Sequence, residues 1–132
     1  MFYFLVEIKC TIILKIIFIY FGLMVFYFFN RCALANPGII QNKKSDINNV
    51  AYCSICQVYY NPNNNVEHCS ICGIWVENID HHCIWVGKCV GKNNKFSFYA
   101  MLFSIGLFYA YIILIVFLKY VFIKKNKITK ND

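Results

Sequence analysis

Residues 68–98 read HCSICGIWVENIDHHCIWVGKCVGKNNKFSF, and they are the most informative part of the chain. Residues 53–91 hold six of the eight cysteines and all three histidines, without helical periodicity. The pairs Cys53/Cys56 and Cys69/Cys72 have the C-x2-C spacing that brings two thiolates onto one tetrahedral ion. Such a short segment has too small a core to fold unaided and needs metal or disulfides. The histidines favour zinc, because disulfides have no use for imidazole.

The sequence on either side of this stretch is apolar. The chain of 132 residues is 60% hydrophobic and 14% charged, whereas soluble domains carry about 25% charged residues. Residues 97–118 contain no charge, and residues 10–29 contain only Lys15, which can snorkel to the interface. A 132-residue soluble protein could not bury both segments as core helices. The pattern therefore predicts two membrane-spanning helices, and it does not fit a cleavable signal peptide.

These observations predict the fold class. We expect an α-helical membrane protein in which two transmembrane helices flank a small zinc-binding, cysteine-rich domain with short β-hairpins. No internal repeat of 20–50 residues is evident. The expected parts are a first transmembrane helix (1–29), a linker with an Asn-Pro-Gly turn (30–49), the zinc domain (50–96), a second transmembrane helix (97–123) and a basic tail (124–132).

The chain is basic, with a formal net charge of +7. Lysines that flank a hydrophobic span usually meet lipid headgroups, so we expect membrane lipid as a partner and no nucleic acid. Two cysteines lie outside the cluster. Cys10 is expected to be a small apolar residue of the first span. Cys32 is juxtamembrane, and it is either buried at the interface or a lipidation site.

The central motif has a family resemblance. Asp80-His81-His82-Cys83 is followed by Trp85, and then by Cys89-Val90-Gly91, Asn94 and Phe98 at matching spacing. This constellation resembles the DHHC cysteine-rich domain of protein S-acyltransferases, also called palmitoyltransferases. Asn36-Pro37-Gly38 looks like a variant of the family's Asp-Pro-Gly motif. The resemblance covers about residues 20–120.

The resemblance implies two zinc ions, each with three cysteines and one histidine. One site would be formed by Cys69, Cys72, His82 and Cys89. The other would take Cys53, Cys56, His68 and a fourth ligand at position 75, which here is Trp75 and cannot ligate zinc. One or two zinc ions are therefore expected. The alternative is a single four-thiolate site from the two C-x2-C pairs.

The resemblance also implies a reaction. Cys83 would attack the thioester of a fatty acyl-CoA, become S-acylated, and pass the palmitoyl group to cytosolic cysteines of membrane-associated substrate proteins. Asp80 and His81 would activate the thiol as orienting carboxylate and base. Lys88, Lys92 and Lys95 either meet CoA phosphates or are ordinary flanking charge. Aromatic side chains are expected to seat the site at the bilayer interface: Trp85, Phe96, Phe98 and Tyr99.

Several departures from the family pattern keep alternatives open. Ile84 and Lys88 replace the family's proline and asparagine, and family enzymes have four or more membrane helices. The alternatives to an active S-acyltransferase are a non-catalytic membrane zinc module or scaffold, and a fragment of a longer four-helix acyltransferase. An active enzyme would need homo- or hetero-oligomers to complete it. We expect a multi-pass protein of the endomembranes, Golgi or endoplasmic reticulum, with a cytosolic zinc domain.

Overall fold

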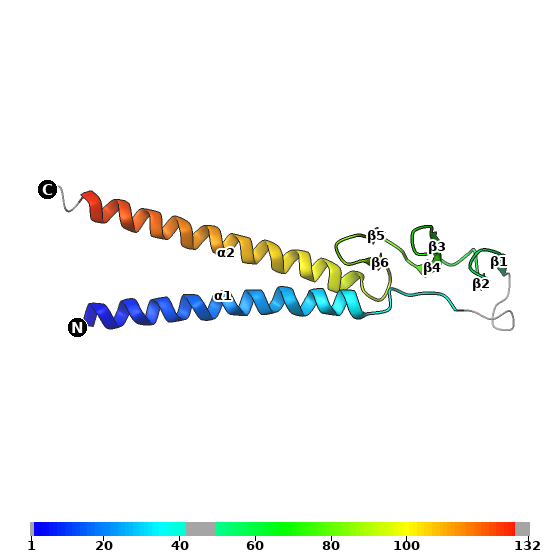
Figure 1. Ribbon diagram of the computed structural model, residues 1–132, viewed down its shortest axis with the longest axis horizontal. Helices are drawn as coiled ribbons and strands as arrows, with labels where there is room; N and C mark the ends of the chain where they lie inside the picture. Colours follow the sequence, from blue (N-terminus) through cyan, green and yellow to red (C-terminus); the bar gives the residue numbers. More distant parts are fainter. Residues whose placement is uncertain (1, 42–49, 129–132) are drawn as a thin grey trace. The chain divides into compact units, whose positions relative to one another are not determined.

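The computed structural model describes residues 2–41 and 50–128, and it describes side chains for residues 11–41 and 50–124. The side chain of Cys10, linker residues 42–49 and tail residues 129–132 lie outside these described parts. Along the chain, one long helix precedes six short strands and a second long helix follows them (Figure 1). The elements are α1 (Phe2–Leu34), β1 (Ala51–Cys53), β2 (Val58–Tyr60), β3 (Val66–Cys69), β4 (Ile74–Glu77), β5 (His81–Cys83), β6 (Lys88–Val90) and α2 (Lys95–Ile128).

The chain divides into two compact units, Met1–Phe26 with Leu102–Asp132, and Tyr27–Met101. In the first unit, α1 and α2 pack through aromatic side chains. The rings of Phe18 and Phe108 lie 5.0 Å apart, and Phe21 lies 5.5 Å from Tyr111. The Tyr111 hydroxyl donates a hydrogen bond of 2.6 Å to the Leu14 carbonyl. The Tyr111 hydroxyl therefore has a hydrogen-bond partner within the chain.

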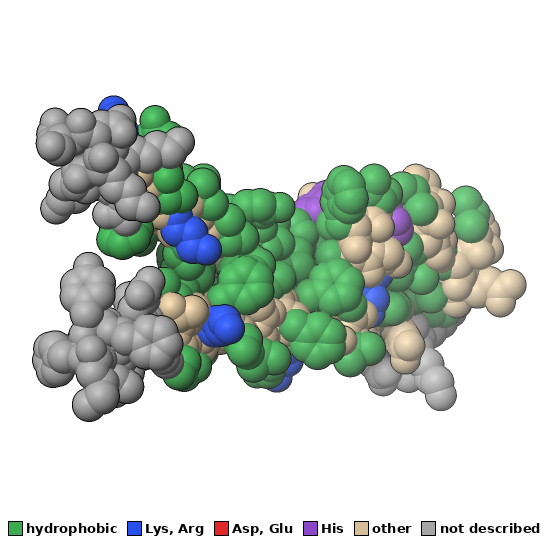
Figure 2. Space-filling view, turned by 60° about the vertical axis from the view of Figure 1, so that its left-hand side comes forward, with side chains coloured by type: hydrophobic (Ala, Val, Ile, Leu, Met, Phe, Trp, Pro, Cys, Tyr) green, Lys and Arg blue, Asp and Glu red, His purple; other side chains and the backbone are tan. Residues whose placement is uncertain are grey.

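Both helices are long and apolar enough to cross a bilayer, over Thr11–Leu34 and Lys95–Lys124. Their large apolar side chains are exposed: Phe26 by 66% and Phe103 by 68%. Figure 2 shows hydrophobic side chains over most of the visible face of these helices, with few lysines or arginines. The core helix of a soluble protein would bury such side chains. Length, composition and exposure together suggest a membrane protein.

The second unit contains three antiparallel β-hairpins, β1–β2, β3–β4 and β5–β6. The first strand of each hairpin ends at a cysteine: Cys53, Cys69 and Cys83. Four residues further, each turn has a residue with positive φ, which is 55° at Gln57, 65° at Gly73 and 71° at Gly87. The hairpins thus repeat one turn geometry, with a period shorter than the 20–50 residues considered from the sequence. The asparagine-rich loop 61–65 connects β2 to β3.

The β3–β4 and β5–β6 hairpins share a small core, and the segment after α1 packs beside it. Val76 and Val90 are fully buried. Ile39 forms a β-bridge with Val76, and the Glu77 N–H donates to the Gly38 carbonyl at 2.9 Å. Gly38 has a φ of 106°, which favours glycine. The Asn-Pro-Gly segment therefore extends the β3–β4 hairpin by a short third strand-like contact.

Asn94 joins three parts of this unit through its fully buried side chain. Its Oδ1 accepts a hydrogen bond from the Gly91 N–H at 2.8 Å. Its Nδ2 donates to the carbonyls of Cys89 at 3.0 Å and Cys32 at 3.3 Å. The amide thus fixes the start of α2 against the last turn of α1 and the β5–β6 hairpin. A buried amide left without these partners would be costly.

Candidate active site and metal centres

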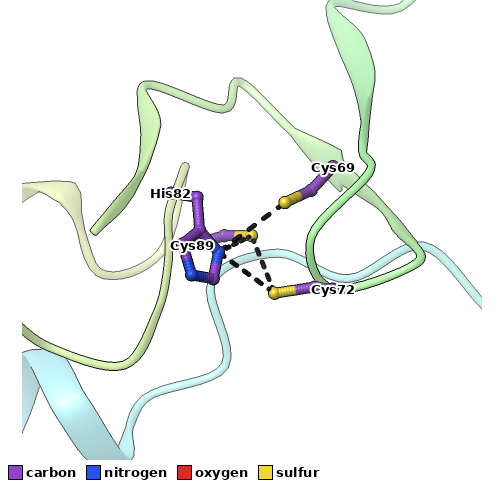
Figure 3. Close-up of side chains that lie close together, drawn as sticks. All are labelled: Cys69, Cys72, His82 and Cys89. Carbon is purple, nitrogen blue, oxygen red and sulfur yellow. Dashed lines mark hydrogen bonds between the residues drawn. The ribbon is translucent and has the colours of Figure 1, made fainter. Parts of the chain in front are cut away.

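Four side chains converge between the β3–β4 and β5–β6 hairpins (Figure 3). This four-ligand cluster consists of Cys69, Cys72, His82 and Cys89. His82 Nδ1 lies 3.2 Å from Cys72 Sγ, 3.7 Å from Cys69 Sγ and 3.8 Å from Cys89 Sγ. Ligands about 2.0–2.3 Å from zinc in a tetrahedron lie about 3.5–3.8 Å from one another. The donor chemistry and the spacing both fit a structural zinc ion.

A second group lies between the β1–β2 and β3–β4 hairpins. This three-ligand cluster consists of Cys53, Cys56 and His68, and its ligand atoms lie within 4.8 Å of one another. Cys56 Sγ is 3.0 Å from His68 Nε2. The Trp75 indole N–H beside the Cys53 thiol lowers the pKa of Cys53 to about 7, although Nε1 meets no hydrogen-bond partner at regular geometry. This cluster offers zinc one ligand fewer than the first.

The grouping bears on two alternatives raised by the sequence. The two C-x2-C pairs belong to different clusters, so they do not assemble one four-thiolate site. The described cysteines are all free thiols. Cys72 and Cys89 Sγ lie 3.6 Å apart, well beyond the roughly 2.05 Å of a disulfide bond. The arrangement fits metal binding and not a disulfide framework.

The central motif lies on strand β5, and the strand separates its two histidines. Successive side chains of a strand point to opposite faces. His82 belongs to the four-ligand cluster, whereas His81 and Cys83 share the other face. Cys83 belongs to neither metal cluster and is buried, with 5% of its surface exposed. The strand thus places one histidine in the four-ligand cluster and the other on the same face as the Cys83 thiol.

Asp80 collects three donors immediately before this strand. His81 Nδ1 lies 3.1 Å from Asp80 Oδ2, Lys95 Nζ lies 2.7 Å from Oδ1, and the Tyr99 hydroxyl donates to Oδ2 at 3.1 Å. Lys95 first, and then His81, hold the pKa of Asp80 down to about 2. With Nδ1 protonated and bonded to Asp80, His81 keeps the Nε2 lone pair for a proton. Asp80 and His81 therefore have the geometry of a carboxylate that orients an imidazole.

The three lysines considered for CoA phosphates all contact groups within the second unit. Lys88 Nζ donates to the Ala35 carbonyl at 3.0 Å, just beyond the end of α1. Lys92 pairs with Glu77 at 2.6 Å, and Lys95 pairs with Asp80. Binding of CoA by these lysines stays a prediction. Of them, Lys95 has the contact closest to the candidate chemistry.

The aromatic residues expected at an interface differ in their placement. Trp85 and Phe96 are exposed by 84% and 79%, and Tyr99 by 50%. Phe98 is buried, and its ring packs edge-on against His81 at 5.0 Å. Phe98 is therefore an internal support for His81 and not an interface residue.

Sequence reasoning missed the roles of Lys95 and Tyr99 around Asp80. These two residues are four positions apart on α2, so they share one helix face. The spacing of Lys95 and Tyr99 could be seen in the sequence. The sequence could not show which carboxylate this helix face contacts, because Asp80 lies outside α2.

A family model described as DHHC palmitoyltransferase matches residues 46–132. Palmitoyltransferase ZDHHC9 from Pongo abelii is 42% identical over 74 residues, which is 53% of this chain and 20% of the relative. Palmitoyltransferase ZDHHC18 from Mus musculus is 43% identical over 61 residues, 46% of this chain and 16% of the relative. The chain thus spans about a fifth of the length of these curated relatives. With the family match over more than half of its residues, this chain belongs to the DHHC palmitoyltransferase family.

Proposed function

We propose that the chain is a protein S-acyltransferase with Cys83 as the acyl-accepting nucleophile. The observation that carries this proposal is that His81, held by Asp80, shares a face of β5 with a thiol outside both metal clusters. The relatives are named palmitoyltransferases, which supports a palmitoyl group as the cargo. The donor would be a fatty acyl-CoA.

The reaction needs two thioester exchanges. His81 Nε2 takes the Cys83 proton, and the thiolate attacks the acyl-CoA carbonyl. The bond from the carbonyl carbon to the CoA sulfur breaks, and CoA leaves as a thiol with the proton returned by His81. In the second exchange His81 Nε2 takes the proton of a substrate cysteine thiol, and the resulting thiolate attacks the carbonyl carbon of acyl-Cys83. The bond from that carbon to Cys83 Sγ breaks, and Cys83 leaves as a thiol with the proton returned by His81. Zinc, when bound, would hold the hairpins in place.

Asp80 fixes the histidine in the orientation that this sequence of steps needs. Its Oδ2 accepts from Nδ1 and stabilises the imidazolium that forms. Phe98 holds the ring from the side. Because Cys83 is buried, the acyl group would enter a site with little water.

The test uses the full chain in detergent, at a high protein-to-detergent ratio that favours assembly, with a labelled palmitoyl-CoA. The label should attach through a hydroxylamine-sensitive thioester, and Cys83→Ser should abolish it. Cys32→Ser is the matched control, because Cys32 is also a buried thiol outside both clusters, and it should keep the label. Zinc content should be the same in all three proteins. A zinc-loaded wild type without label would favour the non-catalytic scaffold instead.

We further propose the placement and partners of the enzyme. The two apolar helices would cross an endomembrane, Golgi or endoplasmic reticulum, and the zinc domain would face the cytosol, where acyl-CoA and reduced substrate cysteines are found. Arg31 in the last turn of α1 supports this orientation by the positive-inside rule. Glycosylation tags at both termini should be modified. Unmodified termini with a modified tag in the loop would reverse the orientation.

A further inference from the structure

The three-ligand cluster at the β1–β2 hairpin differs from the four-ligand cluster in one respect. Both clusters combine thiolates with one imidazole, which are zinc ligands. Cys53, Cys56 and His68 place their ligand atoms within 4.8 Å of one another. With both thiols deprotonated, these three ligands neutralise a divalent ion but occupy only three corners of its tetrahedron. The donor set fits zinc with one position left.

Trp75 lies where the fourth protein ligand would be. It is the direct cross-strand partner of His68, so the two side chains share one face of the β3–β4 hairpin. Its ring lies 5.5 Å from the His68 ring and stacks on Tyr60 at 3.8 Å and 18°. An indole can donate a hydrogen bond but has no lone pair for a metal. Trp75 therefore fills space beside the cluster without completing it.

Two further observations concern the fourth ligand position of this cluster. Trp75 Nε1 is buried and has no regular hydrogen-bond partner in the described part of the chain. A native structure seldom leaves such a donor without an acceptor. Cys53, Cys56 and His68 are each half-buried, so solvent reaches the cluster. A ligand with a lone pair, bound to the metal, would complete the tetrahedron. It would also accept a hydrogen bond from the Trp75 indole N–H.

We propose that Cys53, Cys56 and His68 hold an exchangeable zinc ion whose fourth position is taken by water and is open to a small anion. In proteins, three protein ligands plus one solvent position mark zinc sites that accept external ligands, whereas structural sites are closed by four. The domain thus carries one closed site and one open site. The open site makes the β1–β2 hairpin dependent on zinc supply.

Cobalt substitution of the full chain in detergent tests this proposal. The visible bands of tetrahedral cobalt respond to each ligand, so two Co²⁺ per chain are expected, and azide should shift the bands of one of them. Cys53→Ser should remove the azide-responsive bands. Trp75→Cys should close the site and abolish the azide shift, whereas Trp75→Phe, which keeps a ring but loses the N–H, should retain it.

Removal of zinc gives a second readout. A chelator should extract zinc from the wild type in two phases, and Trp75→Cys should convert the fast phase into a slow one. One metal per chain, unchanged by Cys53→Ser, would overturn the proposal. Two metals per chain with a cobalt spectrum that azide does not change, in both the wild type and Trp75→Phe, would also overturn the proposal.

Discussion

Asp80 is the residue at which the structure concentrates polar contacts, and Lys95 is its strongest partner. The Lys95–Asp80 distance of 2.7 Å is shorter than the 3.1 Å contact with His81. We predict that Lys95→Met lowers the rate of Cys83 acylation at saturating acyl-CoA by roughly tenfold, because Asp80 would hold His81 less firmly. Lys95→Arg should retain most of the rate, since it restores the charge.

The kinetic parameters of Lys95→Met distinguish two possible roles of Lys95. If Lys95 positions Asp80, the saturating rate falls. If it binds CoA phosphates instead, KM for acyl-CoA rises and the saturating rate is kept. Lys92→Met is the control, because Lys92 pairs with Glu77 and not with Asp80, so its saturating rate should match the wild type. A pure KM effect at Lys95 would contradict the positioning role.

Gly91 is the residue with the least space. A Cβ there would lie 2.5 Å from the Pro37 carbonyl oxygen and 2.6 Å from Val76 Cγ1. We predict that Gly91→Ala destabilises the zinc domain by about 1–3 kcal/mol, because backbone must move. The melting of its near-UV circular dichroism measures this. Gly22→Ala, with nothing within 4 Å of the added methyl group, should leave the melting temperature unchanged.

At the scale of elements, the three hairpins offer an internal comparison. Gln57 has a φ of 55°, close to the 65° of Gly73, and glycine adopts such positive angles without steric cost. We predict that Gln57→Gly stabilises the zinc-loaded domain by up to about 1 kcal/mol, and that Gly73→Gln destabilises it by a similar amount. Melting of the Tyr60–Trp75 signal in near-UV circular dichroism reports both changes. Equal melting temperatures for the two variants would contradict a shared turn geometry.

The elements show what the sequence could predict. The apolar blocks predicted two long helices, because composition alone decides such segments. The C-x2-C spacing predicted the metal-binding chemistry, because it is local. The repeat of three turns was not found, since Gln57 breaks the glycine pattern and Val86 stands where the other turns have Cys56 and Cys72. The contacts of Asp80 and Phe98 depend on tertiary packing, which no spacing within one element reveals.

At the scale of the molecule, we expect the two described helices to limit the activity of this chain alone. The described residues of the first unit leave an apolar groove of about 480 Å³ between α1 and α2, with Lys15 and Lys119 at its rim. Two helices present a face to an acyl chain of sixteen carbons but do not enclose it. Positioning a reactant contributes strongly to catalysis, so an acyl chain that is free to diffuse should react slowly.

We therefore predict that acylation of Cys83 requires assembly, through self-association or a partner that supplies further helices. Gly106 and Tyr109 are three residues apart on an exposed face of α2 and offer close approach and a polar contact. The rate per molecule should rise as the protein-to-detergent ratio increases. Gly106→Leu should weaken that rise, whereas Tyr120→Phe, at another exposed position of α2, should not. A strictly monomeric preparation with a full rate would contradict the prediction, because one copy would then suffice to position the acyl chain.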